Sequence, residues 1–408
     1  MLPVQEYINH FKDIWNNSSE DLPDFHKIYS KEEKLKHEIH FDGFQKKLKE
    51  LQNVRKVQQL KKDPAKSFFP MFRSFLDTVF DFDSSHLEII LSDEFKDVSK
   101  DFFYKAREFA PELSPEDIYQ GMRNVWIMNG LQLMAQKPVK ITPSVFAYSM
   151  IYPYSDNLLD DPEISKEQKV EFSSRFDQRL HGHEINPQNF NEEQLYKLVS
   201  MFEEEFPREE FQNVYESLYA IQRGQTNSLK LSPEYGLSDD EICTICFEKG
   251  GASVLADGYL VGGKLTMEQE RALFGYGVYL QLLDDIQDVK EDSMAFTNTM
   301  FSCLEEKHLG KFVNKTIHFG RETLKEMSCF EGTQTEAFIG LMNRSIETMI
   351  IESVGLNHLW YDKTYLAELE QFSPLHYSFI RKKRTQGKSQ RFALLQKYFD
   401  SSREKLAV

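Results

Sequence analysis

The chain has 408 residues, of which 65 are acidic and 49 basic, so its formal net charge is -16. This length allows one large domain or two ordinary ones, and the acidic balance disfavours a nucleic-acid-binding protein, which needs a basic face for phosphate. Its 4 cysteines are too few for a disulfide framework. No stretch approaches the ~18 consecutive apolar residues of a membrane span. The N-terminal residues lack the pattern of a signal peptide, so a cytoplasmic location is expected.

Residues 1–65 are predicted to form an N-terminal helical extension. They are rich in Lys and Glu, and no candidate catalytic residue lies among them. Residues 31–62 place apolar side chains at helical spacing between charged ones, which is typical of a solvated amphipathic helix or a pair of helices. The rest of the chain, residues 66–408, is predicted to be an α-helical catalytic domain.

The helical period dominates the rest of the chain. Residues 192–206 and 272–289 place apolar side chains at i, i+3, i+4 and i+7, and alternating patterns bounded by hairpin turns are hard to find. Thr142 supplies an N-cap before a proline at the first helical position. Residues 232–233 and 262–263 mark breaks between helices. The sequence therefore predicts an all-α fold of about ten or more helices.

A first acidic cluster follows an apolar helical stretch within residues 144–165. Asp156 and Asp160 are four residues apart, and Asp161 follows directly. Carboxylates at a helix C-terminus oppose the helix dipole, so helix stability does not explain them. The helical residues below Asp156 form a stripe with two aromatic rings, made of Val145, Tyr148, Ser149 and Tyr152.

A second acidic cluster repeats this design in residues 281–292, which read QLLDDIQDVKED. Asp284, Asp288 and Asp292 lie along one helix face, about 6 Å apart per step, although like charges at this spacing destabilise a helix. Paired carboxylates are natural ligands of Mg²⁺, which keeps waters for an anionic substrate. Two such clusters facing each other across a bundle would hold several Mg²⁺ ions and a diphosphate above an apolar tail.

These motifs resemble those of the class I isoprenoid synthases, which include trans-prenyltransferases, squalene and phytoene synthases, and class I terpene cyclases. DNLLD at 156–160 is similar to the first aspartate motif, DDxxD, and LQLLDDIQD at 280–288 is similar to FQxxDDxxD. GQTNSL at 224–229 resembles GQxxDL. KGG at 249–251 resembles the KTG that breaks a cavity helix and reaches the diphosphate.

The resemblance implies a class I isoprenoid synthase-type helical bundle with a central apolar cavity, a prenyl diphosphate substrate and two or three Mg²⁺ ions. It is also compatible with a homodimer. The metal ligands that it implies, with the catalytic aspartates among them, are Asp156, Asp160, Asp161, Asp284, Asp285, Asp288 and Asp292. The substrate-binding residues that it implies are Lys249, Gln225, Arg223, Arg381, Tyr377, Tyr148, Ser149, Tyr152 and Tyr219.

The residues after Asp161 depart from the pattern of elongating prenyltransferases. Those enzymes carry Arg-Arg-Gly there to hold a second diphosphate, whereas this chain reads PEISKEQK, and lysine is a poorer substitute for the planar arginine fork. We therefore expect a Mg²⁺-dependent terpene synthase that ionises one linear prenyl diphosphate and then cyclises it or eliminates to a terpene. The alternatives are a chain-elongating or head-to-head prenyltransferase, and a non-enzymatic scaffold whose acidic patches bind Ca²⁺ or a basic partner.

Overall fold

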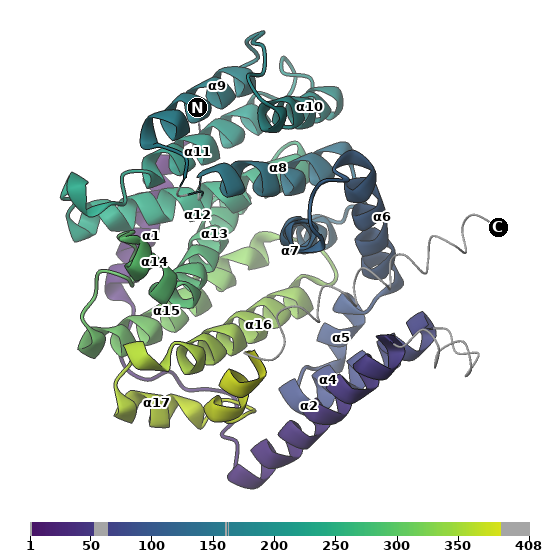
Figure 1. Cartoon of the computed structure of the whole chain (residues 1–408), viewed down its shortest axis with the longest axis vertical. Coiled ribbons are helices and arrows are strands. Elements are labelled where there is room, and N and C mark those ends of the chain that lie inside the picture. Colours follow the sequence, from purple (N-terminus) through teal and green to yellow (C-terminus); the bar gives the residue numbers. More distant parts are fainter. Residues whose placement is uncertain (1, 53–63, 160, 162, 385–408) are drawn as a thin grey trace. The chain divides into compact units, whose positions relative to one another are not determined.

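The computed structural model describes residues 2–52, 64–159, 161 and 163–384 (Figure 1). Within these ranges the chain forms α-helices, short 3-10 helices and no β-strands, so the prediction of an all-α fold is confirmed. Among the helices of these ranges, none combines the length and the apolar character that a membrane crossing requires.

The chain divides into two compact units. Unit 1 comprises residues 1–23 and 120–339, and unit 2 comprises residues 24–119 and 340–408. The boundary that the sequence predicts at residue 65 stays a prediction. Two helices contribute residues to both units, namely α7 (Pro115–Met134) and α16 (Thr335–Leu356).

Unit 1 contains all the predicted aspartate motifs. Its α12 packs most extensively against α13 and α11, and α8 packs against α10 and α12. The first helix, α1, is part of this bundle, because its buried Phe11 and Trp15 contact aromatic rings of α12, α13 and α15. The helices of the unit are α1 (Val4–Asn17), α8 (Pro143–Leu159), α9 (Lys166–Leu180), α10 (Phe190–Glu205), α11 (Gln212–Ser228), α12 (Asp239–Gly262), α13 (Met267–Gln287), α14 (Val289–Ala295) and α15 (Glu306–Glu326), with the 3-10 helices η1 (Pro233–Tyr235) and η2 (Met327–Cys329).

Local sequence signals fix where the site-bearing helices begin. Ser238 and Glu241 form a capping box at the start of α12, and Thr266 and Gln269 form another at the start of α13. The predicted N-cap of α8 is confirmed, because the Val145 N–H donates to the Thr142 hydroxyl at 3.2 Å. The predicted break at residues 262–263 is also confirmed, since α12 ends at Gly262 and the following Gly263 has a positive φ of 72°.

Glycines allow α11, α12 and α13 to cross at very short distances. A Cβ atom on Gly277 of α13 would lie 2.2 Å from the carbonyl oxygen of Gly250 on α12. A Cβ atom on Gly224 of α11 would lie 2.9 Å from the Cα atom of Lys249. The backbones therefore touch where GQ and KGG meet, and α12 continues through residues 249–251 without the break that the KTG resemblance implies.

Unit 2 carries the rest of the chain. The helical prediction for residues 31–62 is confirmed over α2 (Lys31–Gln52), which pairs with α4 (Pro64–Phe80), whereas residues 53–62 lie outside the described residues. The rings of Phe44 and Phe75 stack between them, with centroids 4.1 Å apart. The remaining helices of the unit are α5 (Ser84–Ile90), α6 (Asp93–Phe109), η3 (His358–Trp360) and α17 (Lys363–Glu370).

Candidate active site

The second acidic motif lies at the junction of α13 and α14. Asp284 is in the last turn of α13, Asp288 separates the two helices, and Asp292 is in α14. Backbone hydrogen bonds continue through the junction, from Asp288 N to Asp284 O at 2.9 Å and from Asp292 N to Asp288 O at 2.8 Å. Asp284 and Asp288 are exposed, whereas Asp292 is half-buried. The predicted column of carboxylates is therefore present on a nearly continuous helical path.

Negative charge is in excess around this column. Burial, together with Asp285, Asp288 and Asp284, raises the pKa of Asp292 to about 8. Burial also raises the pKa of Asp285 to about 7, while a hydrogen bond from Gln281 opposes the shift. A cation bound among these carboxylates would stabilise their ionised forms, because metal binding and proton binding compete for the same oxygens.

Lys249 supplies a positive charge to the same place from α12. It is half-buried, and its charge lowers the pKa of both Asp285 and Asp292 against the effect of burial. The backbone of Lys249 lies against Gly224, which precedes the half-buried Gln225 on α11. Three motifs that are separate in the sequence, GQTNSL, KGG and the second acidic cluster, thus meet in unit 1.

Asp285 lies behind the column. It is buried, and each carboxylate oxygen accepts a hydrogen bond, from Gln281 Nε2 at 2.8 Å and from the backbone N–H of Met300 at 3.3 Å. The second contact ties the segment after α14 to α13. This geometry fits a residue that positions the motif; the metal-ligand role predicted from the sequence stays a prediction.

The donor chemistry of the motif fits Mg²⁺, because several carboxylates adjoin a lysine in a place where their charges are not balanced. Within the described residues, no three His, Cys, Asp or Glu side chains converge closely enough to hold a metal ion by themselves. The chain's own groups that would hold Mg²⁺ are Asp284, Asp288 and Asp292, with waters and substrate oxygens completing its coordination.

The first acidic motif is only partly described. Asp156 belongs to α8, its side chain is not described, and Asp160 lies outside the described residues. The carboxylate of Asp161 accepts a hydrogen bond from the Glu163 N–H at 2.8 Å, which forms a turn before α9. The metal-ligand roles of these three aspartates therefore stay predictions.

The stripe below Asp156 points toward α12 and α7. The hydroxyl of Tyr148 donates to the Ser253 carbonyl at 3.2 Å, and that of Tyr152 lies 2.9 Å from the Ser253 hydroxyl. The Ser149 hydroxyl accepts from Asn124 Nδ2 at 3.3 Å. These side chains form hydrogen bonds with α7 and α12 in unit 1, and the substrate-binding role predicted for them stays a prediction.

Sequence reasoning did not find the polar group at the centre of this network. Asp257 of α12 is fully buried, and its Oδ1 accepts from Asn124 Nδ2 at 3.1 Å, whereas its Oδ2 has no partner among the described residues. Burial raises the pKa of Asp257 well above its usual range. The only sequence signal is an aspartate inside the apolar run ASVLADGYLVG of α12.

Two predicted substrate-binding residues of α11 have other partners. Tyr219 stacks on His181, with ring centroids 3.8 Å apart, and its hydroxyl accepts from Arg208 at 3.3 Å. Arg223 donates from Nε to Glu248 Oε1 at 2.6 Å. Neither contact involves the aspartates, so the roles predicted for these two residues stay untested.

The predicted C-terminal pair belongs to unit 2. Tyr377 is buried against Gly355 of α16, and Arg381 Nη1 donates to the Gly355 carbonyl at 3.0 Å. Residues 385–408, which follow this pair, lie outside the described residues. The substrate-binding role of Tyr377 and Arg381 stays a prediction.

The described residues of unit 1 enclose at least two cavities. One, of about 310 Å³, lies among α1, α11 and α12, and a smaller one of about 150 Å³ lies beside the last turns of α7 and α12. Neither is lined by the acidic motifs or by Tyr148 and Tyr152. The central apolar cavity implied by the family resemblance thus stays a prediction.

Comparison with known proteins gave structural similarities alone. No family model and no curated protein matches the chain. A geranyltransferase from Legionella pneumophila is 12% identical, with a TM-score of 0.38, over 64% of this chain and 99% of its own. A geranylgeranyl pyrophosphate synthetase from Pyrococcus horikoshii is 15% identical, with a TM-score of 0.36, over 72% of this chain and 99% of its own. At these TM-scores, neither similarity carries an argument about function.

Proposed function

We propose that the protein is a Mg²⁺-dependent enzyme of isoprenoid diphosphate metabolism that ionises a prenyl diphosphate. The observation that carries the proposal is the meeting of Lys249 with the carboxylates of α13 and α14, at the point where Gly224 contacts the Lys249 backbone. A diphosphate needs both a bound cation and a fixed positive side chain, and this arrangement offers a place for each.

Each group has a distinct role in the proposed reaction. Asp284, Asp288 and Asp292, together with Asp156, Asp160 and Asp161 of the first motif, would hold Mg²⁺, which would neutralise the leaving diphosphate when bound. Lys249 donates to diphosphate oxygens. Asp285 positions the second motif through its bonds to Gln281 and to the Met300 N–H.

The residues after the first motif favour a terpene synthase over chain elongation. Lys166, a nearby cation, forms an ion pair with Glu234 and lies over the ring of Tyr235. The carboxylate of Glu163 is exposed and would repel a second diphosphate. With Lys166 engaged by η1, these residues offer no arginine fork for isopentenyl diphosphate.

A prenyltransferase is the second candidate. The two similar solved structures are described as a geranyltransferase and a geranylgeranyl pyrophosphate synthetase, and prenyl transfer begins with the same ionisation. At TM-scores of 0.38 and 0.36 these names carry no argument between the two reactions, and the second candidate rests on the shared ionisation step.

One assay separates the candidates. The purified protein is incubated with Mg²⁺ and geranyl, farnesyl, geranylgeranyl or geranylfarnesyl diphosphate, with and without isopentenyl diphosphate, and products are identified by mass spectrometry. A terpene synthase releases diphosphate and a hydrocarbon or terpene alcohol from one substrate alone. A longer diphosphate formed only with isopentenyl diphosphate would establish elongation, and a squalene- or phytoene-like product would establish head-to-head coupling. No Mg²⁺-dependent diphosphate release from any substrate would refute both candidates and favour the scaffold.

A further inference from the structure

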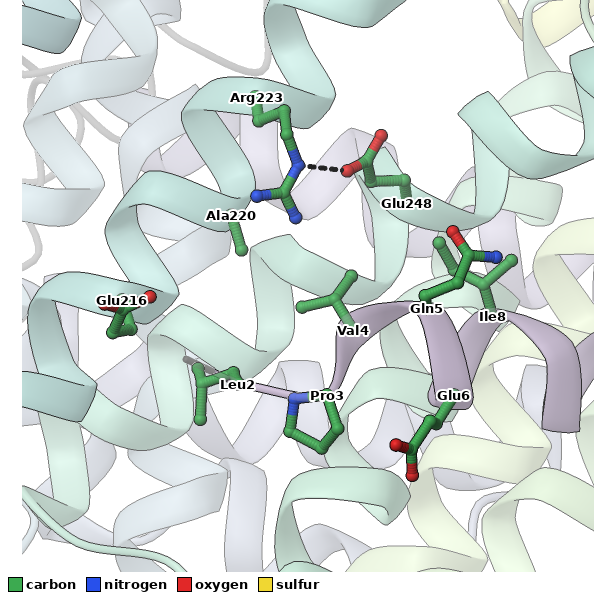
Figure 2. Close-up of a pocket in the computed structure, with 10 residues that line it drawn as sticks. All are labelled: Leu2, Pro3, Val4, Gln5, Glu6, Ile8, Glu216, Ala220, Arg223 and Glu248. Carbon is green, nitrogen blue, oxygen red and sulfur yellow. Dashed lines mark hydrogen bonds and ion pairs between the residues drawn. The ribbon is translucent and has the colours of Figure 1, made fainter.

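The cavity among α1, α11 and α12 has one apolar wall and one charged wall (Figure 2). The apolar wall comes from α1 and the residues before it, with Leu2, Val4 and Ile8 all buried, and from Ala220 of α11. Its volume of about 310 Å³ is at the lower end of the range typical of small-molecule sites. A ligand with a short aliphatic body would fit it.

The charged wall presents an arginine whose orientation is fixed. Arg223 Nε donates to Glu248 Oε1 at 2.6 Å, and Asn227 Nδ2 donates to Glu248 Oε2 at 2.8 Å, so both oxygens of the nearly buried carboxylate are occupied. The terminal nitrogens of Arg223 have no partner among the described residues. In Figure 2 they lie on the side of Ala220 and Val4. An arginine held by Nε presents its other edge as a planar pair of donors, which matches a carboxylate.

The charges around the cavity restrict the kind of anion. Glu248 balances the charge of Arg223, while Glu216 and Glu6 also line the cavity and have no partner within the described part of the chain. This local excess of negative charge disfavours a dianion such as a phosphate ester. A monoanion placed against the arginine fork keeps its charge next to Arg223, the one cation among the described residues that line the cavity.

We propose that this cavity binds a short aliphatic carboxylate, with its acid group on Nη1 and Nη2 of Arg223 and its chain against Leu2, Val4, Ile8 and Ala220. The site is separate from the aspartate motifs, since none of their residues lines it. Arg223 thus serves a second ligand, in place of the diphosphate that the sequence suggested.

Isothermal titration calorimetry tests the proposal in buffer without Mg²⁺ or prenyl diphosphate, so its outcome is independent of the proposed enzymatic function. The probes are hexanoate, 3-methylbutanoate, inorganic phosphate and hexylammonium. The test variants are Arg223→Gln, which removes the fork, and Ala220→Leu, which fills the cavity. Arg271→Gln is the matched control, because Arg271 also pairs through Nε, with Glu326 at 2.8 Å, at a place outside the cavity.

We expect saturable binding of hexanoate or 3-methylbutanoate to the wild-type protein and to Arg271→Gln. Arg223→Gln should weaken it roughly tenfold or more, as expected for losing charge-assisted hydrogen bonds, and Ala220→Leu should abolish it. Arg223→Gln leaves Glu248 without its counter-charge, so the double variant Arg223→Gln/Glu248→Gln repeats the measurement with a neutral pair if the single variant fails to fold. The proposal is overturned if neither carboxylate binds, if Arg223→Gln or the double variant binds as tightly as wild type, or if phosphate or hexylammonium binds more tightly.

Discussion

Glu248 and Lys249 are neighbours on α12, yet their side chains lie in opposite electrostatic settings. Lys249 lies beside carboxylates that outnumber it, and the pKa of Asp292 is raised to about 8 there. Glu248 has its charge balanced by Arg223 and its second oxygen occupied by Asn227. Around Lys249 the negative charges outnumber the positive charge, which suits a metal ion. The Arg223–Glu248 pair is neutral and leaves Nη1 and Nη2 of Arg223 for a ligand. The 100° turn between adjacent helical residues separates the two settings.

The largest effect is expected when a proposed Mg²⁺ ligand is removed from the carboxylates beside Lys249. Asp288→Ala should lower the rate of Mg²⁺-dependent diphosphate release by more than roughly 100-fold. Loss of a residue that only hydrogen-bonds a metal ligand typically costs roughly 10–100-fold, and loss of a ligand itself should cost more. The far-UV circular dichroism should stay unchanged, because the substitution also relieves repulsion between like charges. Glu291→Gln, at an exposed carboxylate of α14, is the control and should retain activity. Activity of Asp288→Ala within a few-fold of wild type would refute the ligand assignment.

The next largest effect is expected on protein stability, when the close crossing of α12 and α13 is disturbed. Gly277→Ala would put a methyl group 2.2 Å from the Gly250 carbonyl oxygen, so we expect the free energy of unfolding to fall by about 3 kcal/mol, near the upper end for overpacking. Denaturant titration measures this. Gly262→Ala is the matched control, because its Cβ atom would lie 3.4 Å from Leu265, an ordinary contact. Equal free energies of unfolding for the two variants would show that α12 and α13 do not touch at Gly277.

A smaller effect on kcat/KM is expected when Lys249 is replaced, and it should exceed the effect of replacing another lysine near the second acidic motif. Lys249→Gln should lower kcat/KM for a prenyl diphosphate by roughly tenfold or more, since it removes a charge-assisted hydrogen bond to the substrate. Lys290→Gln, at an exposed lysine of α14, should leave kcat/KM within twofold of the wild-type value. This corresponds to a change in activation free energy of about 0.4 kcal/mol or less, as expected for an exposed charge. Steady-state kinetics at saturating Mg²⁺ distinguish the two. Equal losses would mean that Lys249 contributes only to the general potential of the site.

The smallest expected effect concerns Asp257, a buried carboxyl group of α12 that has no counter-charge among the described residues. The pKa of Asp257 is raised well above its usual value by burial, whereas in the unfolded chain it is about 3.9. The folded state therefore holds the proton more tightly, and the contribution to stability is complete below a pH of about 4 and is lost as the pH rises toward the folded pKa.

Asp257→Asn removes this dependence. Its Tm should match that of wild type near pH 4 and exceed it by roughly a few degrees at pH 8, as measured by thermal unfolding across that range. Asp13→Asn, at an exposed aspartate of α1, is the control. A difference in Tm that shrinks with rising pH would contradict the raised pKa.

The sequence by itself determined the helical class, the capped starts of α12 and α13, and the column of Asp284, Asp288 and Asp292. These features depend on a period of 3.6 residues and on side chains within one turn of each other, so neighbouring residues are enough to specify them.

The tertiary structure alone decided which groups meet. Gly224 and Gly250 resemble parts of a catalytic motif in the sequence, whereas in the fold they allow backbones to touch. Arg223 is directed to Glu248, and Asp257 becomes a buried acid next to Asn124. Burial and charge balance depend on residues 25 to more than 100 positions away in the chain, as the Arg223–Glu248 and Asn124–Asp257 pairs demonstrate. No local pattern records which of these distant faces come together.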